Sequence, residues 1–160
     1  MPNPTSMGDF RPISCCNTVY KCITKIIAKR CQEVLPHIID ESQSAFIKGR
    51  RISDNVLLAQ DIMRDYHKDN GKPRVTAKVD LMKTYDAVSW EFIIDLLTVL
   101  NFSPNMIHWI HVCITTPKFP INLNGESICF FHGAKGLRQG DRISPYLFVI
   151  VMDFLSQLLV

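Results

Sequence analysis

The most informative stretch of the sequence is Lys78-Val79-Asp80-Leu81-Met82-Lys83-Thr84-Tyr85-Asp86-Ala87-Val88-Ser89-Trp90. Alternating apolar residues at Val75, Ala77 and Val79 predict a short buried strand that ends at Asp80. The chain then turns through an aromatic residue into a helix that begins near Ser89. A carboxylate at the end of a strand is held in a fixed direction, as a catalytic metal ion requires of its ligand. Asp80 is therefore the first candidate for a metal ligand.

Composition and length indicate one globular domain. The chain has 160 residues, of which 47% are apolar and 21% are charged, so it can bury a core. Its net charge of +3 permits a polyanionic partner without requiring one. Six cysteines occur without a C-x-x-C pair or a secretory leader, and no apolar run reaches the ~20 residues of a membrane span. These features favour an intracellular, reduced protein with no membrane segment.

The N-terminal half predicts two helices joined by a basic loop. After a loop of about a dozen residues, a helix is expected to begin at a cap on Asn17 or Thr18 and to stop at Pro36. Its inward residues would be Val19, Ile23, Ile26, Ile27 and Val34, and its other face is basic, which is typical of ordinary solvation. The second helix is predicted from about Asp54 to Tyr66, followed by an Asn70-Gly71 turn. Its inward residues would be Val56, Leu57, Ala59, Ile62, Met63 and Tyr66.

The connector between these helices, residues 37–51, carries three cations within four residues. Lys48, Arg50 and Arg51 lie around Gly49. Lysine and arginine side chains with free backbone N–H groups are suited to phosphate. The pattern alone is a weak indication of phosphate contact.

The C-terminal half predicts helices over 90–100 and from Ser103-Pro104 to about Ile114, then a hairpin at Asn124-Gly125. His108, His111 and Cys113 have spacings that could in principle hold a metal. Packing and surface roles are favoured for them, because no carboxylate or second cysteine lies nearby in the sequence. A glycine-punctuated loop over 133–141 leads to an apolar last helix, 146–159, capped by Ser144-Pro145. Because it is apolar nearly all round, this helix should be buried on most sides.

Four blocks in this order resemble the reverse transcriptases of non-LTR (LINE-type) retrotransposons, most closely the plant-like ones. The blocks are Asp9 to Ser14, Gln43 to Asn55, Lys78 to Trp90, and Gly136 to Asp141 with Ser144 to Phe148. The resemblance implies an α+β fingers and palm fold that is incomplete, mostly helical with a short palm sheet and one β-hairpin. It further implies a partial reverse transcriptase domain over 1–160: an N-terminal loop over about 1–8, a fingers-like part over 9–77 and a partial palm over 78–160.

The resemblance also implies roles for individual residues in an RNA-directed DNA polymerase. Asp80 would be a catalytic aspartate of this nucleotidyltransferase, and with two later acids it would hold two Mg²⁺ ions. The backbone carbonyl of Leu81 would be a further metal ligand. Tyr85 would exclude a 2′-hydroxyl on the incoming nucleotide, whereas Asp86 is interpreted as structural. Two further sets of residues follow from the same resemblance. Gln139 and Gly140 would lie against the bases, and Arg11, Lys48 and Arg50 would contact nucleotide or template phosphates, with Arg51 as an alternative to Arg50.

The sequence departs from this family in ways that limit the expected activity. Thr84 stands where the family usually has alanine, and Arg142 where it usually has proline. The aromatic-Ala-Asp-Asp block is absent, and the sequence contains no Asp-Asp pair. We therefore expect a fragment, truncated before that block, that is inactive by itself and would bind Mg²⁺ only loosely. Its intact parent would use an RNA template, a DNA primer and dNTP.

Two further expectations follow. The alternative interpretation is a non-catalytic relic or a co-opted nucleic-acid-binding module that uses Lys48, Arg50, Arg51 and Arg138. An unpaired palm strand and an uncovered last helix would expose a sheet edge and an apolar face, so self-association is expected.

Overall fold

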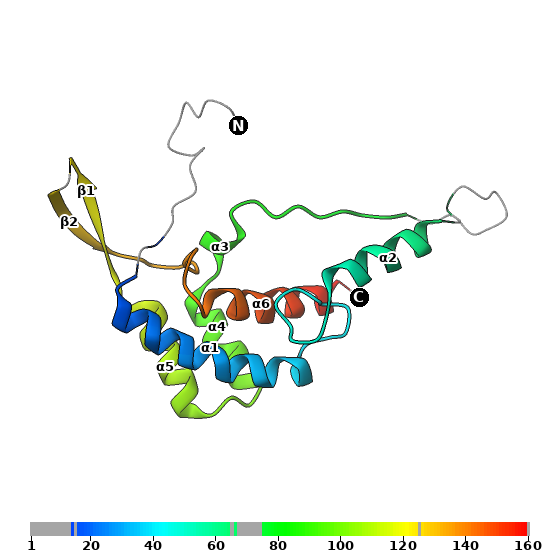
Figure 1. Ribbon diagram of the computed structural model, residues 1–160, viewed down its shortest axis with the longest axis horizontal. Helices are drawn as coiled ribbons and strands as arrows, with labels where there is room; N and C mark the ends of the chain where they lie inside the picture. The colour runs from blue at the N-terminus through cyan, green and yellow to red at the C-terminus, as the bar shows by residue number, and fades with distance from the viewer. Residues whose placement is uncertain (1–13, 15, 65, 67–74, 125, 160) are drawn as a thin grey trace.

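The computed structural model describes residues 14, 16–64, 66, 75–124 and 126–159. Within these residues the chain forms helices and a single antiparallel hairpin (Figure 1). In chain order they are α1 (Thr18–Ile38), α2 (Ile52–Met63), α3 (Thr84–Ala87), α4 (Trp90–Val99), α5 (Pro104–Thr115), β1 (Lys118–Leu123), β2 (Glu126–His132) and α6 (Ser144–Leu158). The predicted N-terminal loop and the Asn70-Gly71 turn lie outside the described residues. No helix among those described is long and apolar enough to cross a membrane.

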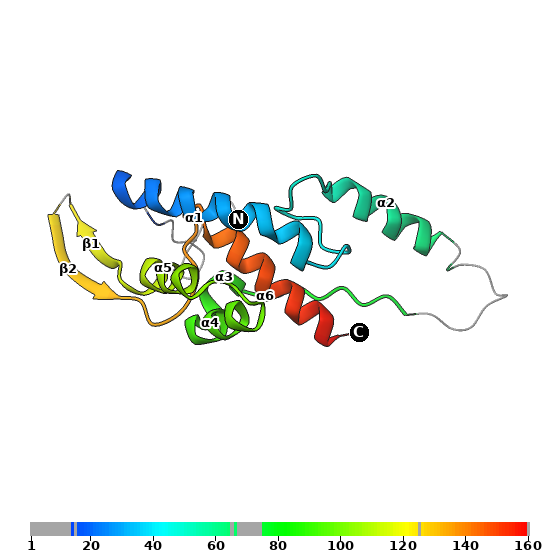
Figure 2. The ribbon, with the colours of Figure 1, turned by 90° about the horizontal axis from the view of Figure 1, so that it is seen from below.

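Four helices make the body of the protein. α5 packs against α4 and α1, and α6 packs against α1 and α4. Their facing sides form one apolar core, in which Leu35, Leu97, Ile110 and Leu147 are fully buried. The hairpin projects from one end of this body and α2 from the other (Figures 1 and 2).

The cap predicted for α1 is confirmed, but the predicted end is wrong. The side chain of Asn17 accepts a hydrogen bond from the Tyr20 N–H at 2.8 Å, which satisfies one of the free donors at a helix start. Pro36 lies inside the helix, which continues to Ile38. The carbonyls of Pro36 and Ile39 accept hydrogen bonds from the guanidinium of Arg50. An external donor therefore satisfies carbonyls at this end of the helix.

The inward face predicted for α1 is also wrong. Of the predicted inward residues only Ile27 is buried, while Val19, Ile23, Ile26 and Val34 are exposed. The buried stripe lies about a quarter turn further around the helix: Thr24, Ile27, Ala28, Cys31 and Leu35. α1 carries apolar side chains around more than half of its circumference, and its packing against α5 and α6 selects which of them are buried.

α2 does not pack as its sequence predicts. The helix is present, but none of its residues is buried, and its apolar side chains are exposed. Both views place it away from the body of the protein (Figures 1 and 2). Amphipathic periodicity identifies the helix correctly but does not supply a surface for it to cover.

The predicted strand before Asp80 is absent, so the predicted palm sheet does not form among the described residues. Residues 75–80 run as an extended segment without strand pairing. Val75 is 90% exposed and Val79 is 67% exposed, so neither enters the core. A strand needs a neighbour to satisfy its backbone groups, and no described segment pairs with this one.

The caps predicted at Ser89 and Ser103 and the hairpin predicted around Asn124 are confirmed. Ser89 and Ser103 cap α4 and α5, each accepting a hydrogen bond from a backbone N–H three residues ahead. β1 and β2 pair antiparallel, with Leu123 opposite Glu126 and Phe119 opposite Phe131. The fold is therefore mostly helical with a small two-stranded antiparallel sheet.

α6 is covered mainly along its first half. Ser144 does not act as a side-chain cap, because it lies within the helix and is buried. Asp153, also buried, accepts hydrogen bonds from the backbone N–H of Asp40 at 3.0 Å and from the side chain of Gln157 at 2.7 Å. This carboxylate ties α6 to the segment that follows α1. The last residues, Leu158 and Leu159, are exposed.

Two aliphatic residues of α4, one buried and one exposed, test where the core lies. Leu97→Ala should destabilise the protein by about 2–5 kcal/mol, because it leaves a cavity in the core. Val99→Ala, on the exposed side of the same helix, should change the free energy of unfolding by no more than about 0.5 kcal/mol. Urea unfolding followed by circular dichroism measures both. Equal losses in the two variants would contradict the packing described.

Candidate active site

Asp80 lies at the end of the extended segment, two residues before a tight turn into α3. Its side chain is exposed, and Lys83, which caps α3, has a left-handed backbone with φ +50°. The hydroxyl of Thr84 donates a hydrogen bond to the Leu81 carbonyl at 2.7 Å. A carbonyl oxygen has two lone pairs, so this bond orients the carbonyl and leaves it one further acceptor site.

The described residues do not by themselves make a metal centre. Two divalent cations require several carboxylates to offset their charge and fix their spacing. Among the residues that the structure describes, no group of three or more His, Cys, Asp or Glu side chains is placed to hold a metal ion. Asp80 and the Leu81 carbonyl therefore do not fit a pair of Mg²⁺ ions as the sole donors.

Tyr85 lies on α3, five residues after Asp80 in the sequence, and is half-buried. Its ring stacks on Phe148 of α6, with ring centroids 4.4 Å apart and planes inclined by 22°. Burial raises the pKa of the Tyr85 hydroxyl, so the residue stays neutral at physiological pH. The stack fixes the position of the ring relative to the body of the protein.

The loop over 133–141 lies directly against α3. The N–H of Gly136 donates to the carbonyl of Val88, and the N–H of Leu137 donates to the carbonyl of Tyr85, each at 2.7 Å. A Cβ on Gly136 would lie 3.1 Å from the backbone of Asp86, and its φ is +92°. Close approach and a left-handed backbone both require glycine here. Two blocks about fifty residues apart in the sequence therefore meet at one place.

Trp90 reinforces this contact from the start of α4. Its indole N–H donates to the carbonyl of Gly136 at 2.7 Å, and its ring lies against Gly133. Gln139 is half-buried, and its backbone carbonyl accepts a hydrogen bond from the Ser14 N–H at 3.0 Å. Gly140 is exposed with φ +97°. The loop that carries the predicted base-contacting residues is thus held by hydrogen bonds to the backbone of Gly136, Leu137 and Gln139.

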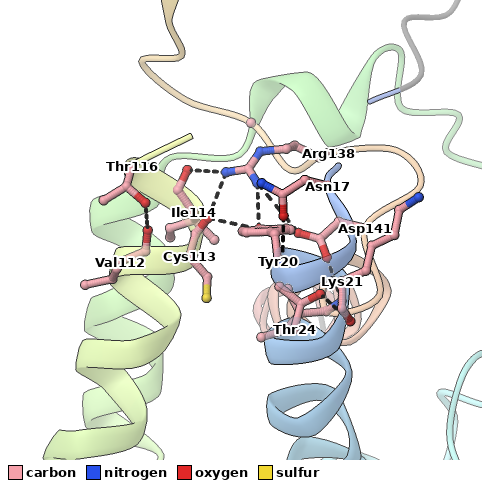
Figure 3. A network of polar contacts seen from close by, with 12 residues as sticks. Asn17, Tyr20, Lys21, Thr24, Val112, Cys113, Ile114, Thr116, Arg138 and Asp141 are labelled. Atoms are coloured by element: carbon pink, nitrogen blue, oxygen red, sulfur yellow. Dashed lines mark hydrogen bonds and ion pairs between the residues drawn. The ribbon is translucent and has the colours of Figure 1, made fainter. Parts of the chain in front are cut away.

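Arg138 belongs to a buried polar network that the sequence did not predict (Figure 3). Its guanidinium donates to the Tyr20 hydroxyl at 2.6 Å and to the carbonyls of Cys113 and Ile114 at 2.8 and 2.9 Å. The Asp141 carboxylate lies 3.8 Å from the guanidinium and accepts a hydrogen bond from the Tyr20 hydroxyl at 2.6 Å. The side chains of Arg138 and Asp141 are 8% and 3% exposed. Arg138 is therefore not available to bind phosphate.

The network changes the acidity of its members. Burial, together with the hydrogen bond to the Asp141 carboxylate, raises the pKa of the Tyr20 hydroxyl far above its ordinary value. Burial and the same carboxylate also raise the pKa of the Cys113 thiol. Tyr20 and Cys113 are therefore neutral in the folded protein. Arg138 and Asp141, opposite charges three residues apart, are the signal by which sequence reasoning could have found part of this network.

The three connector cations have different environments. The guanidinium of Arg50 donates to the backbone carbonyls of Pro36, Ile39, Asp40 and Gln43, so its terminal nitrogens are occupied within the loop.

Lys48 and Arg51 are exposed, and the described residues engage neither of them in an ion pair or side-chain hydrogen bond. Of the predicted phosphate contacts on this loop, the Lys48 side chain is therefore accessible to a ligand, and Arg51 is more accessible than Arg50. Arg11, the third predicted contact, lies outside the described residues.

The comparisons with known proteins establish the class. The sequence profile of the family described as reverse transcriptase (RNA-dependent DNA polymerase) matches residues 1–160, so the chain belongs to that family.

Its relatives are proteins of transposable elements. The chain is 26% identical over 145 residues to the 149 kDa protein of transposon TX1 from Xenopus laevis, covering 91% of this chain and 11% of that protein. It is 28% identical over 151 residues to the Retrovirus-related Pol polyprotein from type-2 retrotransposable element R2DM of Drosophila melanogaster, covering 94% of this chain and 14% of that one.

A third relative, the Retrovirus-related Pol polyprotein from type-1 retrotransposable element R2 of Nasonia vitripennis, is 29% identical over 155 residues, which cover 95% of this chain and 14% of that polyprotein. The likeness to non-LTR retrotransposon reverse transcriptases is thus confirmed. The chain spans no more than about a seventh of these three relatives. The narrower likeness to plant elements stays a prediction.

The buried network gives a test by substitution. Arg138→Gln should destabilise the protein by about 3–5 kcal/mol, because it leaves the Asp141 carboxylate buried without its cation. Arg142→Gln, which removes an exposed cation immediately after the 133–141 loop, should cost no more than about 0.5 kcal/mol. Chemical denaturation compares the two variants at equal net charge. A loss confined to Arg142→Gln would contradict the structure.

Proposed function

We propose that this chain supplies the fingers and part of the palm of a non-LTR retrotransposon reverse transcriptase. In this proposal residues 1–8 precede the domain, residues 9–77 are fingers-like and residues 78–160 form part of the palm. The parent polymerase would extend a DNA primer on an RNA template with dNTP. The observation that supports the proposal is the contact between α3 and the 133–141 loop, which carries Gln139 and Gly140: the N–H of Leu137 donates a hydrogen bond to the carbonyl of Tyr85, within a chain of the reverse transcriptase family.

Each residue has a proposed role in that parent enzyme. Asp80 would supply one of the carboxylates that the chemistry needs, with the Leu81 carbonyl beside it. Tyr85 would lie under the sugar of the incoming nucleotide, and its stack on Phe148 supports this role because a steric filter has to be rigid. Gln139 and Gly140 would lie against the base pair.

The resemblance implies phosphate contacts by Arg11, Lys48 and Arg50. Because the Arg50 guanidinium already donates to four backbone carbonyls, we propose Arg51 in its place.

We further propose that the chain has no polymerase activity by itself. The support is chemical: a single exposed carboxylate cannot offset the charge of two divalent cations. An intracellular location and self-association through the extended segment before Asp80 stay predictions.

Primer extension tests this proposal. The purified chain, a DNA primer on an RNA template, and all four dNTPs with Mg²⁺ or Mn²⁺ should give no templated product, whereas a complete reverse transcriptase run alongside does. The Asp80→Asn variant is the matched control for trace contamination. Templated incorporation that disappears in the Asp80→Asn variant would show that the chain is a polymerase by itself.

The second candidate function is a non-catalytic nucleic-acid-binding module. The exposed pair Lys48 and Arg51 favours it, because cations without protein partners are free to bind phosphates.

We expect the chain to bind an RNA–DNA primer–template with an affinity that falls as salt rises. Replacing both Lys48 and Arg51 by glutamine should reduce the slope of log K against log[salt] by about one to two units. Arg64→Gln is the control, since Arg64 pairs with Asp61 on α2 at 2.9 Å. Fluorescence anisotropy from 50 to 300 mM salt gives the slopes. An unchanged slope in the double variant would remove these cations from the interface.

A further inference from the structure

A cavity of about 470 Å³ lies where the connector meets α1, the first residue of α2 and the first turn of α6. It is an open hollow on the surface and is not enclosed on all sides. Its lining combines aromatic, cationic and amide side chains: Gln32, Ser44, Phe46, Ile47, Lys48, Arg50, Ile52 and Tyr146. Of these residues, the sequence alone had indicated only the cations as candidates for ligand binding.

Phe46 is the unusual member of this lining. Its backbone has φ +60°, a left-handed conformation that is uncommon for a bulky residue and unfavourable for it. Its ring is 56% exposed, whereas Ser44 and Ile47 on either side are buried. The buried residues Ser44 and Ile47 therefore anchor the loop, and the exposed ring of Phe46 lines the cavity. A strained residue fixed by its surroundings is a reason to look for function.

The charges of the lining select the ligand. Among the described residues that line the cavity there is no carboxylate, and the cations are Lys48 and Arg50. The terminal nitrogens of Arg50 are taken by backbone carbonyls, which leaves the ammonium of Lys48 to meet an anion. One available cation matches the single charge of a phosphodiester. The triphosphate of a free nucleotide, with about four negative charges, would need more cations than this.

We infer that this cavity binds one unpaired nucleotide of a nucleic-acid strand, with its base on the ring of Phe46 and its phosphate on Lys48. The inference rests on the proposed function and adds a position and a mode of contact. Stacking of bases on aromatic side chains is the usual way in which proteins hold single strands. The Gln32 amide and the Tyr146 hydroxyl also line the cavity and can form hydrogen bonds with a base edge or sugar.

The test is equilibrium binding of a fluorescein-labelled 12-nucleotide single-stranded RNA to the full chain by anisotropy. Phe46→Ala should weaken binding by about 5- to 100-fold, and Phe46→Tyr should keep it within about twofold because the stacking surface is retained. Phe131→Ala, which removes an exposed aromatic ring from the hairpin, is the matched control and should have no effect. Lys48→Gln should lower the salt slope by about 0.7. Circular dichroism melting confirms that each variant is folded.

Two further measurements locate the contact and the source of the nucleotide. A 4-thiouridine in the RNA should crosslink to the peptide that contains Phe46. A dNTP should not displace the labelled RNA at concentrations at which unlabelled RNA does. Displacement by dNTP at equal concentrations would overturn the assignment to a strand.

Equal affinity of the Phe46→Ala and Phe131→Ala variants, with normal salt-dependent binding, would overturn the cavity assignment and leave the proposed nucleic-acid role standing. Absence of binding to RNA and to primer–template alike would overturn both.

Discussion

The buried pair of Arg138 and Asp141 is the interaction on which the arrangement of this protein depends. Two charges can stay in a protein interior only when their hydrogen-bonding groups find partners. Here the partners are the Tyr20 hydroxyl at the start of α1 and two carbonyls at the end of α5. The pair therefore holds the 133–141 loop to both helices. The same loop presents Gly136 to α3, so the position of the turn after Asp80 depends on this pair.

Sequence reasoning succeeded where a structure is decided by neighbours along the chain. The caps at Asn17, Ser89 and Ser103 and the hairpin around Asn124 each depend on a few adjacent residues. It failed where a structure needs a distant partner. Residues 75–79 have the alternation of a strand, but no described segment pairs with them, and α2 has the periodicity of a packed helix without a surface to cover.

The candidate site was predicted unevenly for the same reason. The resemblance located Asp80, Tyr85 and the 133–141 loop, and the structure brings the last two together. The role of Arg50 and the network around Tyr20 were missed. The donors and acceptors in that network lie up to 121 residues apart in the sequence, so no local sequence pattern predicts their contacts. On α1, apolar residues cover too much of the surface for periodicity to choose the buried stripe.

The run Gly49-Arg50-Arg51 has a consequence for how such sequences are compared. In a sequence alignment the two arginines are equivalent, and a shift of the register by one position changes the alignment score very little. In the folded chain, that shift exchanges a guanidinium that closes off the end of α1 for one that faces solvent. The order of residues in this run therefore carries information that counting its positive charges would lose.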